Sequence, residues 1–224
     1  MNQDSKRWDI IHRKTHKDTD KHSAYAVEKE VLFPRGSVVC DLGGGTGVDT
    51  LYFLQKGHQV ILFDISAFAL EVAERKVKQA GLETKLVTRQ VDFGLHQIPL
   101  NPKSVNVVYS RISLHYFPAS EFTAMLSTIY MSLVPGGMAF ISVKSNEDEA
   151  EMEYLREAAP EYEPGVFIEN GQLRARFSIS QLEDILRNAG IPQFEVKPYN
   201  EQLAHNVHGL PQILLLNEIT FYKK

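Results

Sequence analysis

The residues best suited to hold a ligand form a glycine-rich loop that follows an apolar segment. Residues 38–42 read Val-Val-Cys-Asp-Leu, and the next five positions, Gly-Gly-Gly-Thr-Gly, contain four glycines. Glycine readily adopts positive φ and lets another group approach the backbone closely, but each glycine also costs backbone entropy on folding. We therefore expect this loop to bind a ligand at the end of a buried strand, where open α/β sheets place their ligands.

The glycine spacing separates three kinds of ligand-binding loop. A nicotinamide or flavin site needs G-x-G-x-x-G, and the last glycine of that pattern would fall on Val48 or Thr50. A phosphate-binding P-loop ends in Gly-Lys-Ser/Thr, and this loop has no lysine. The sequence instead reads Asp-x-Gly-x-Gly-x-Gly, which starts at Asp41. A tight turn without a ligand is the remaining alternative.

Two carboxylates follow the next two apolar segments. Asp64 ends the run Val-Ile-Leu-Phe-Asp, and a carboxylate at the tip of a strand can accept hydrogen bonds from both hydroxyls of a ribose. Ribose occurs in several cofactors, and Asp64 is also placed to help cap a helix beside Ser66. Asp92 follows the third apolar run, in a loop where an Asp is most often simply solvated.

Apolar, β-branched runs alternate with helical patterns up to about residue 143, which is typical of a parallel sheet covered by helices. Ser66 is expected to cap a helix that runs to Ala80 and stops at Gly81. The predicted strands are Val38–Leu42, Val60–Asp64, Lys85–Val91, Val105–Ser110 and Met138–Val143.

The pattern changes towards the end of the chain. Ser180 and Glu183 predict a capping box for a helix that ends near Gly190. Phe194–Tyr199 and Ile213–Tyr222 follow without a helix between them, so these two strands should pair antiparallel. The sequence therefore predicts an α/β fold: a Rossmann-like, doubly wound sheet of seven strands, mostly parallel with an antiparallel last strand, and helices on both faces.

We expect residues 1–224 to form a single domain. Its parts are an N-terminal helical cap (1–35), a ligand-binding core (36–143), an acidic and irregular insertion that could act as a lid (145–178), and a closing helix with two antiparallel strands (179–224).

The motifs and their order resemble the class I S-adenosylmethionine-dependent methyltransferases. Asp41, Gly43, Gly45 and Gly47 match the first motif of that family. Leu-Val-Pro-Gly-Gly at 133–137 matches the Leu-x-Pro-Gly-Gly that the family often has before its fifth strand. The likeness covers residues 36–143 and the closing elements, and it is greatest for small-molecule enzymes of the tellurite-resistance and ubiquinone type.

The resemblance implies how S-adenosylmethionine would bind. Asp64 matches the family's acidic residue that binds the ribose, and Ile65 would pack on the adenine. Asp92 would accept a hydrogen bond from the adenine amino group, and Phe93 would border the ring. Backbone carbonyls near two further residues, Ser110 and Arg111, would face the methionine ammonium group.

The same resemblance places the loop after the fourth strand near the sulfonium. Residues 107–117 read Val-Val-Tyr-Ser-Arg-Ile-Ser-Leu-His-Tyr-Phe, and small-molecule members often have Leu-His-His or Leu-His-Tyr in this loop. His115 and Tyr116 are therefore the candidate catalytic residues. His115 would act as a base or position the acceptor, with packing against the cofactor as the alternative.

The acceptor site of such enzymes is built from the N-terminal region, the loop after strand four, the insertion and the last hairpin loop. Residues 147–163 hold eight acidic residues and one basic residue, which form either a solvated helix face or a lid that attracts a cationic amine. Arg174 and Arg176 argue instead for an anionic acceptor. The candidate residues are Trp8, His12, His16, His22, Tyr25, Arg111, His115, Tyr116, Phe167, Arg174, Arg176, His205 and His208.

Composition excludes several classes of protein. The net charge of −4 lacks the basic character of a protein that binds nucleic acid through phosphates. Cys40 is the only cysteine, which excludes a disulfide framework and cysteine-rich metal sites. We expect no metal, no signal peptide, no membrane span and a cytoplasmic protein that is a monomer or a homodimer.

The expected function is transfer of a methyl group from S-adenosylmethionine to a small-molecule N, O or S acceptor. The loop after strand four lacks the Asn/Asp-Pro-Pro-Tyr/Phe motif of the DNA amino-methyltransferases. Two alternatives stay open: a catalytically silent S-adenosylmethionine-binding regulatory protein and a nicotinamide-dependent oxidoreductase.

Overall fold

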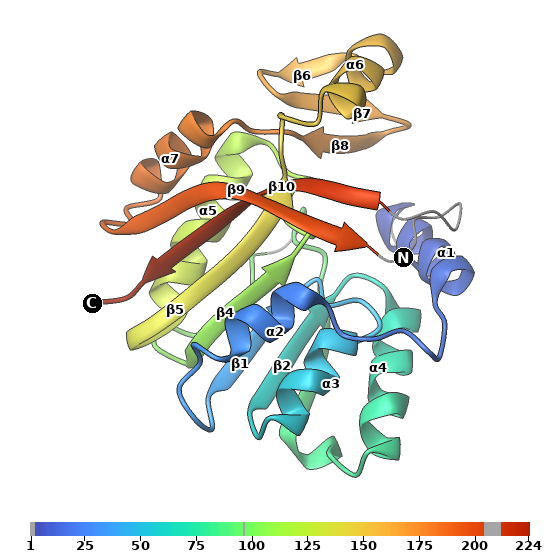
Figure 1. Cartoon of the computed structure of the whole chain (residues 1–224), viewed down its shortest axis with the longest axis vertical. Coiled ribbons are helices and arrows are strands. Elements are labelled where there is room, and N and C mark those ends of the chain that lie inside the picture. The colour runs from blue at the N-terminus through green and yellow to red at the C-terminus, as the bar shows by residue number, and fades with distance from the viewer. Residues whose placement is uncertain (1–2, 96, 204–211) are drawn as a thin grey trace.

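The apolar runs of the sequence become neighbouring strands of one sheet. The computed structural model describes residues 3–95, 97–203 and 212–224, and its main sheet has the strand order β3-β2-β1-β4-β5-β10-β9 (Figure 1). The strands are β1 (Val38–Leu42), β2 (Gln59–Asp64), β3 (Leu86–Gln90), β4 (Val105–Arg111), β5 (Leu133–Lys144), β9 (Phe194–Leu203) and β10 (Gln212–Tyr222).

The directions of the strands confirm the predicted topology. β1 pairs parallel with β2 and β4, β2 pairs parallel with β3, and β4 pairs parallel with β5. β10 pairs antiparallel with both β5 and β9, and the short connection between residues 203 and 212 agrees with this, because a parallel crossover needs a dozen or more residues. The Rossmann-like, doubly wound α/β fold with seven strands and one antiparallel strand is therefore confirmed.

Helices lie between the strands and cover both faces of the sheet. They are α1 (Gln3–Thr15), α2 (Ala24–Glu30), α3 (Val48–Gln55), α4 (Ala67–Gln79), a 3₁₀ turn (Glu83–Lys85), α5 (Ala119–Ser132), α6 (Glu149–Ala158) and α7 (Ile179–Asn188). Ser66 caps α4 as predicted, with its hydroxyl accepting from the backbone N–H of Ala69, and Gly81 has φ +68° just beyond the helix. Within the described residues, no helix is long and apolar enough to cross a membrane.

Side chains of the central strands alternate between two cores, as expected for a sheet covered on both faces. Val39 and Val107 pack with Phe53 of α3, in a cluster that also includes side chains of α2 and α4. Cys40 and Val108 belong to the other cluster, where side chains of α5 and α7 cover the sheet. The thiol of Cys40 is completely buried.

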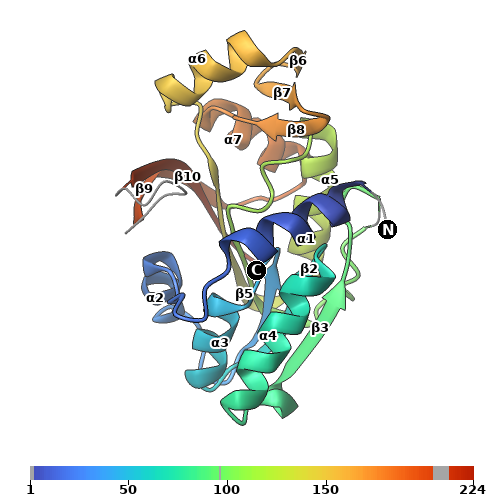
Figure 2. The same ribbon diagram turned by 90° about the vertical axis from the view of Figure 1, so that its right-hand side faces the viewer.

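The insertion at residues 145–178 is regular, so the prediction of an irregular segment is wrong. It consists of α6 and a three-stranded antiparallel sheet of β6 (Glu161–Glu163), β7 (Val166–Glu169) and β8 (Gln172–Ala175). Met152 and Leu155 of α6 pack on Phe167 of β7, which gives the insertion a small core of its own. The insertion lies above the main sheet (Figure 1), and α1 lies between it and helices α3 and α4 (Figure 2).

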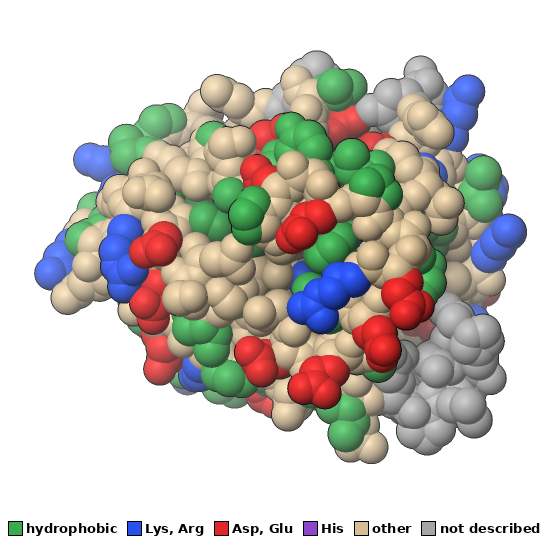
Figure 3. Space-filling view, turned by 90° about the horizontal axis from the view of Figure 1, so that it is seen from above, with side chains coloured by type: hydrophobic (Ala, Val, Ile, Leu, Met, Phe, Trp, Pro, Cys, Tyr) green, Lys and Arg blue, Asp and Glu red, His purple; other side chains and the backbone are tan. Residues whose placement is uncertain are grey.

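Three of the acidic side chains of α6, those of Glu149, Glu153 and Glu157, are exposed. Seen from above, this face of the molecule has acidic side chains spread around a central group of basic ones (Figure 3). These three glutamates therefore form a solvated helix face, whereas Glu151 of the same helix turns inwards to bind basic side chains.

Several strand boundaries differ from the prediction. β5 begins at Leu133 rather than Met138, because the Pro-Gly-Gly segment is a bulge within the strand: Val105 pairs with Leu133, but Val107 already pairs with Met138. Leu133 pairs with β4 ahead of the Pro-Gly-Gly segment, and Gly136 within that segment has φ +77°. β9 and β10 are also longer than predicted and pair along most of their length.

The capping box of α7 uses other residues than predicted. Ser178, not Ser180, is the N-cap, and its hydroxyl accepts from the backbone N–H of Gln181 at 3.2 Å. The side chain of Gln181 in turn accepts from the backbone N–H of Ser178 at 2.9 Å. The motif is therefore shifted by two residues, with Gln rather than Glu at its third helical position.

This assignment predicts different costs for two nearby serines. Ser178→Ala should lower the free energy of unfolding by about 1 kcal/mol, as loss of an N-cap typically does. Ser180→Ala, inside the first turn, should cost less than about 0.5 kcal/mol. Urea denaturation of both variants measures the difference, and equal losses would contradict the cap.

Candidate functional site

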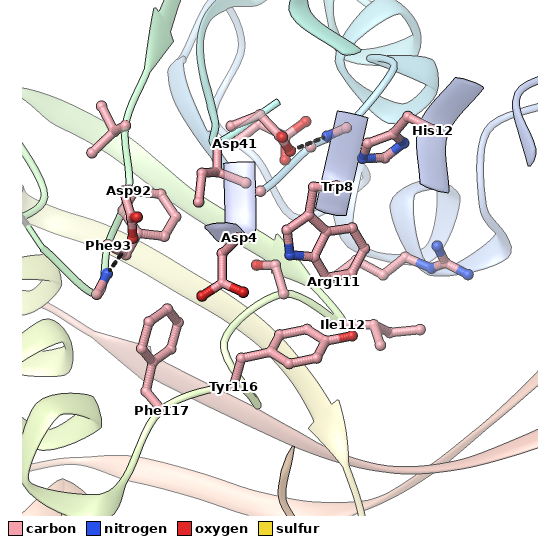
Figure 4. A pocket seen from close by; sticks show the side chains of 18 of the residues that line it. Asp4, Trp8, His12, Asp41, Asp92, Phe93, Arg111, Ile112, Tyr116 and Phe117 are labelled. Atoms are coloured by element: carbon pink, nitrogen blue, oxygen red, sulfur yellow. Dashed lines mark hydrogen bonds between the residues drawn. The ribbon is translucent and has the colours of Figure 1, made fainter. Parts of the chain in front are cut away.

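A cavity of about 550 Å³ lies at the carboxyl ends of β1 to β4 and is covered by α1 and the β7–β8 turn (Figure 4). Its size falls within the range of small-molecule sites, about 300–1,000 Å³. The residues that line it are Asp4, Trp8, His12, Asp41, Gly43, Gly44, Gly45, Thr46, Val48, Asp49, Asp64, Ile65, Val91, Asp92, Phe93, Gly94, Tyr109, Arg111, Ile112, Ser113, Tyr116, Phe117, Glu121, Gly171, Gln172 and Leu173.

The glycine loop forms one wall of the cavity in a conformation that other residues rarely adopt. Gly43, Gly45 and Gly47 have φ of +70°, +55° and +71°. A Cβ on Gly43 would also lie 2.3 Å from the Cβ of Ser113, and a Cβ on Gly47 would lie 2.6 Å from that of Ala73. The loop therefore needs glycine both for its backbone angles and for its close contacts.

Asp64 ends β2 beneath this loop and is buried. One carboxylate oxygen accepts from the backbone N–H of Gly45 at 2.8 Å, and the other accepts from the backbone N–H of Ser66 at 2.8 Å. Burial raises the pKa of Asp64, while these hydrogen bonds and nearby His12 lower it by less. Because each carboxylate oxygen can accept two hydrogen bonds, Asp64 can still accept from a ligand in the cavity.

Asp41 is also buried at the floor of the site. Its carboxylate accepts from the hydroxyl of Thr50 at 2.6 Å. Burial raises its pKa to about 7, against the lowering effect of that hydrogen bond, and Asp49 and Asp64 add to the increase. The Asp41 carboxyl is thus placed to change its protonation state near neutral pH.

Asp49 links the floor of the site to the N-terminal region. It accepts from the phenol of Tyr109 at 2.8 Å, and from the hydroxyl and backbone N–H of Ser23 at 2.9 and 2.7 Å. Ser23 is in turn the N-cap of α2. One buried carboxylate therefore ties α3, β4 and the start of α2 together.

The three residues predicted to hold adenine lie together in one part of the cavity wall. Asp92 and Phe93 follow β3 and line the cavity together with Ile65, which follows β2. Asp92 accepts from the backbone N–H of Gly94 at 2.9 Å, which shapes the turn (Figure 4). Phe117, from the loop after β4, lies across from Asp92 and Phe93.

The end of β4 holds features that the sequence motifs did not indicate. The hydroxyls of Ser110 and Ser113 both donate to the carbonyl of Leu42, at 3.0 and 2.7 Å. Ile112 between them has φ +54°, which is a genuine outlier for a β-branched residue and is typical of functional sites. This strained residue and Ser113 both line the cavity.

Arg111 presents its side chain, not only its backbone, to the cavity wall. Its guanidinium forms a bidentate ion pair with Glu201 of β9, with N–O distances of 2.8 to 3.0 Å. Glu201 is 3% exposed, so the pair is well shielded from water. No local sequence pattern indicates this pair, because its partners are 90 residues apart.

Helix α1 brings three side chains to the cavity, of which Trp8 and His12 were sequence candidates. The ring of Trp8 meets that of Tyr116 edge to face at 5.3 Å, and the ring of His12 lies 5.9 Å from that of Trp8. The third residue, Asp4, pairs with Arg7 at 3.0 Å.

Several contacts hold α1 across the carboxyl ends of the strands. Asp9 accepts from the hydroxyl of Ser66 at 2.6 Å, and the hydroxyl of Ser5 donates to the carbonyl of Ile65 at 3.2 Å. Arg7 donates to the carbonyl of Asn170 in the β7–β8 turn at 2.7 Å. The helix therefore binds both the core and the insertion.

His115 does not take the predicted position over the site. It is 3% exposed and does not line the cavity; its ring lies 4.2 Å behind that of Tyr116, between the loop and the insertion. Burial lowers its pKa well below the ordinary value, and Arg176, Lys144 and Arg174 lower it further. The expectation that this imidazole faces the reacting atoms is corrected: the neighbouring Tyr116 lines the cavity instead.

Two other predicted cofactor residues stand behind the cavity wall. Gly47 packs against α4, and Ser110 points to Leu42; neither lines the cavity. The predicted residues that do line it are Asp41, Gly43, Gly45, Asp64, Ile65, Asp92, Phe93, Arg111 and Tyr116.

The remaining acceptor candidates have structural contacts elsewhere. His22 stacks on Tyr52, Tyr25 packs in the core, and His16 pairs with Asp18. Phe167, Arg174 and Arg176 belong to the insertion and do not line the cavity. The remaining pair of candidates, His205 and His208, lies outside the described residues. Across residues 3–95, 97–203 and 212–224, no group of three or more His, Cys, Asp and Glu is arranged to hold a metal ion.

Comparison with known proteins connects this site to a family. Residues 39–137 match the family model described as a methyltransferase domain. Over 120 residues, the chain is 30% identical to the carboxy-S-adenosyl-L-methionine synthase of Hydrogenovibrio crunogenus, an alignment that covers 52% of this chain and 46% of that protein. The matches span less than half the length of the curated relatives.

Solved structures share the whole fold at low sequence identity. One, from work on the conversion of a disulfide bond into a thioacetal group during echinomycin biosynthesis, has a TM-score of 0.71 and 21% identity, covering 98% of this chain and 91% of that chain. Another is 1,6-didemethyltoxoflavin-N1-methyltransferase from Burkholderia thailandensis, with bound 1,6-didemethyltoxoflavin and S-adenosylhomocysteine. It has a TM-score of 0.64 and 19% identity, covering 99% and 86%.

The matched segment contains the glycine loop, Asp64, Asp92 and the end of β4, which form much of the cavity, whereas α1 and the β7–β8 turn that cover it lie outside the match. The cofactor of this family is S-adenosylmethionine, as the resemblance of the loop implied. In residues 39–137 the chain is similar to a methyltransferase domain, and its seven-stranded fold is that of solved S-adenosylmethionine-dependent methyltransferases, so the chain resembles the class I members of that family.

Proposed function

We propose that this chain is an enzyme that moves the methyl group of S-adenosylmethionine to an N, O or S atom of a small molecule by in-line displacement. The observation that carries the proposal is a single cavity with two unlike halves. One half is the glycine loop with Asp64 and Asp92, and the other is a wall of aromatic and apolar side chains around Trp8 and Tyr116. A cofactor and an acceptor would thus meet in one enclosed space.

The residues present fit the cofactor. A Cβ at Gly43 would collide with Ser113, and one at Gly45 would lie 3.0 Å from the His12 ring, so the loop leaves a cradle that only bare backbone provides. Buried carboxylates at Asp41 and Asp64 suit a ligand that has cationic groups and ribose hydroxyls. Asp64 would hold the ribose, and Asp92 with Phe93 and Ile65 would hold the adenine.

S-adenosylmethionine supplies an electrophilic methyl group on a sulfonium, which leaves as a neutral thioether. The protein's part is then to bind, orient and exclude water. The Asp49–Tyr109 and Ser113–Leu42 hydrogen bonds fix the floor, and α1 closes the site from above. Fixed orientation of this kind is worth up to ~7–11 kcal/mol of barrier lowering in favourable cases.

The first prediction separates the proposal from its rivals. Calorimetric titration should show micromolar binding of S-adenosylmethionine and S-adenosylhomocysteine and no binding of reduced nicotinamide dinucleotide. Trp8 is the only tryptophan and lines the cavity, so its fluorescence should change in the same titration. Binding of the nicotinamide alone would overturn the cofactor assignment, and binding without turnover of any small acceptor would favour the silent regulatory protein.

A second prediction concerns the ribose carboxylate. Asp64→Asn keeps the shape of the side chain but removes its charge and half of its acceptor capacity. It should weaken binding of S-adenosylhomocysteine at least about tenfold, or ~1.4 kcal/mol. Asp184→Asn on the exposed face of α7 is the matched control and should bind normally. Unchanged affinity of the Asp64 variant would refute its role.

A third prediction uses the pKa of Asp41, which burial raises to about 7. Near pH 7 this carboxyl is about half protonated, and a cation bound in the cavity favours its ionised form. Binding of S-adenosylmethionine should therefore release protons. The measured enthalpy at pH 7 should be more exothermic in Tris than in phosphate, because Tris takes up protons with more heat.

The Asp41→Asn variant should lose most of that buffer dependence, whereas Asp184→Asn should keep it. Circular dichroism checks that the Asp41 variant is folded. Equal enthalpies in both buffers for the unaltered protein would mean that Asp41 does not titrate on binding.

A further inference from the structure

Resting on the proposed function, we propose that the acceptor is a flat heteroaromatic molecule, that it stacks on Trp8 and Tyr116, and that an uncharged ring nitrogen takes the methyl group. Two separate features of the cavity support this: the shape and chemistry of its walls, and its charge.

The walls favour a planar, aromatic ligand. Trp8 from α1 and Tyr116 from the loop after β4 meet edge to face at 5.3 Å, so one aromatic face of the pair borders the cavity. Ile112 and Leu173 also line the cavity and add apolar surface. Figure 4 shows the Trp8 ring and the Tyr116 ring turned towards the same space, between Asp4 and Ile112. Such pairs bind other rings by offset or edge-to-face stacking.

The charges of the site disfavour an anionic acceptor. Arg111 is the one Lys or Arg among the lining residues. Its Nε and Nη2 atoms both bind the carboxylate of Glu201. Two cations of the insertion near the cavity are likewise paired: Arg174 binds Glu169 at 2.9 Å, and Arg176 binds Glu151 at 3.0 Å. Six carboxylates line the same cavity, so a carboxylate or phosphate on the acceptor would meet mainly like charge.

Two titratable groups beside the aromatic wall, His115 and Tyr116, are poorly suited to remove a proton. His115 lies behind Tyr116 and is held neutral with a strongly lowered pKa, by burial and then by Arg176, Lys144 and Arg174. Burial raises the pKa of Tyr116, with Arg174 and Arg176 lowering it by less, so the phenol stays protonated. His12 faces the glycine loop, with its ring beside Gly45 and in the field of Asp64 and Asp9.

An acceptor that already has a free electron pair at neutral pH needs no help from His115 or Tyr116. Phenols and alcohols would need a base, and an alkylamine is mostly protonated, like a lysine amine with a pKa of about 10.4. The ring nitrogen of a pyridine-type heteroaromatic is a weak base and keeps its electron pair in the ring plane. It therefore needs no proton transfer before it reacts.

The charge balance of the step agrees with the acidic cavity. The electron pair of the ring nitrogen forms the N–CH₃ bond, while the S–CH₃ bond breaks and its electron pair stays on sulfur. The positive charge moves from sulfur to nitrogen, and no proton is released or taken up. The cavity thus holds one such cation throughout, which buried carboxylates and the faces of Trp8 and Tyr116 stabilise on either atom.

Four bicyclic probes of similar size test the proposal: isoquinoline, decahydroisoquinoline, 1-naphthol and 1-naphthoate. Each is titrated by calorimetry into the protein saturated with S-adenosylhomocysteine. Isoquinoline should bind at least about tenfold more tightly than the saturated amine or the carboxylate. With S-adenosylmethionine, mass spectrometry should show N-methylisoquinolinium and no O-methylated naphthol.

Two variants test the role of the aromatic wall. Trp8→Leu should weaken isoquinoline binding at least about fivefold and leave binding of S-adenosylhomocysteine within about twofold, since stacking is lost but the glycine loop is untouched. Tyr222→Leu, which removes an exposed ring at the other end of the sheet, is the matched control and should bind both ligands normally.

The outcomes separate this inference from the proposed function. Tighter binding of naphthoate or decahydroisoquinoline, no effect of Trp8→Leu, binding of none of the probes, or methylation of naphthol but not isoquinoline would each overturn the acceptor class. The proposed function survives any of these results if S-adenosylhomocysteine binds. Failure of S-adenosylhomocysteine to bind would overturn both proposals.

Discussion

The close approach of two backbone segments, Gly43 after β1 and Ser113 after β4, determines the shape of the whole site. A single methyl group at Gly43 would lie 2.3 Å from the Ser113 side chain, so the two strand ends can meet only through a glycine. The carbonyl of Leu42 accepts hydrogen bonds from Ser110 and Ser113, which locks that approach. Because β1 is the central strand between β2 and β4, the same contact sets where Asp64 on one side and Ile112 on the other face the cavity.

A second constraint follows from placing carboxylates under this loop. Asp41, Asp49 and Asp64 are all buried, and buried carboxylates are costly unless they are hydrogen-bonded or paired. Each has hydrogen-bond donors from different elements: Thr50 for Asp41, Tyr109 and Ser23 for Asp49, and the backbone of Gly45 and Ser66 for Asp64. These donors form hydrogen bonds to the carboxylate oxygens but do not neutralise their negative charge. A cationic ligand in the cavity would balance that charge.

Local patterns were enough to predict the parts of the fold that depend on near neighbours. The strands buried on both faces, the Ser66 cap and the glycine loop each follow from a few consecutive residues, and the structure has all three. The capping box at Ser178 was missed because the pattern Ser180–Glu183 also fits the motif, and only the position of the first helical turn separates them. The insertion was predicted to be irregular because its strands are only three and four residues long and alternate too briefly to be recognised.

The contacts that the sequence did not predict are those between distant segments, and these define the acceptor side. Arg111 pairs with Glu201, which is 90 residues away in the sequence. Trp8, near the start of the chain, meets Tyr116 from the middle of the chain. The sequence also could not predict whether His115 or Tyr116 faces the cavity. Adjacent loop residues point in different directions, and only the packing of the insertion decides which one faces inward. The backbone N–H of Ala175 donates to the carbonyl of His115, which fixes the loop so that the imidazole is buried among cations and the phenol is in the cavity. The insertion thus shapes the site although few of its residues line it. Its packing keeps His115, the histidine of the loop after β4, out of the cavity, and the aromatic ring of Tyr116 lines the wall instead.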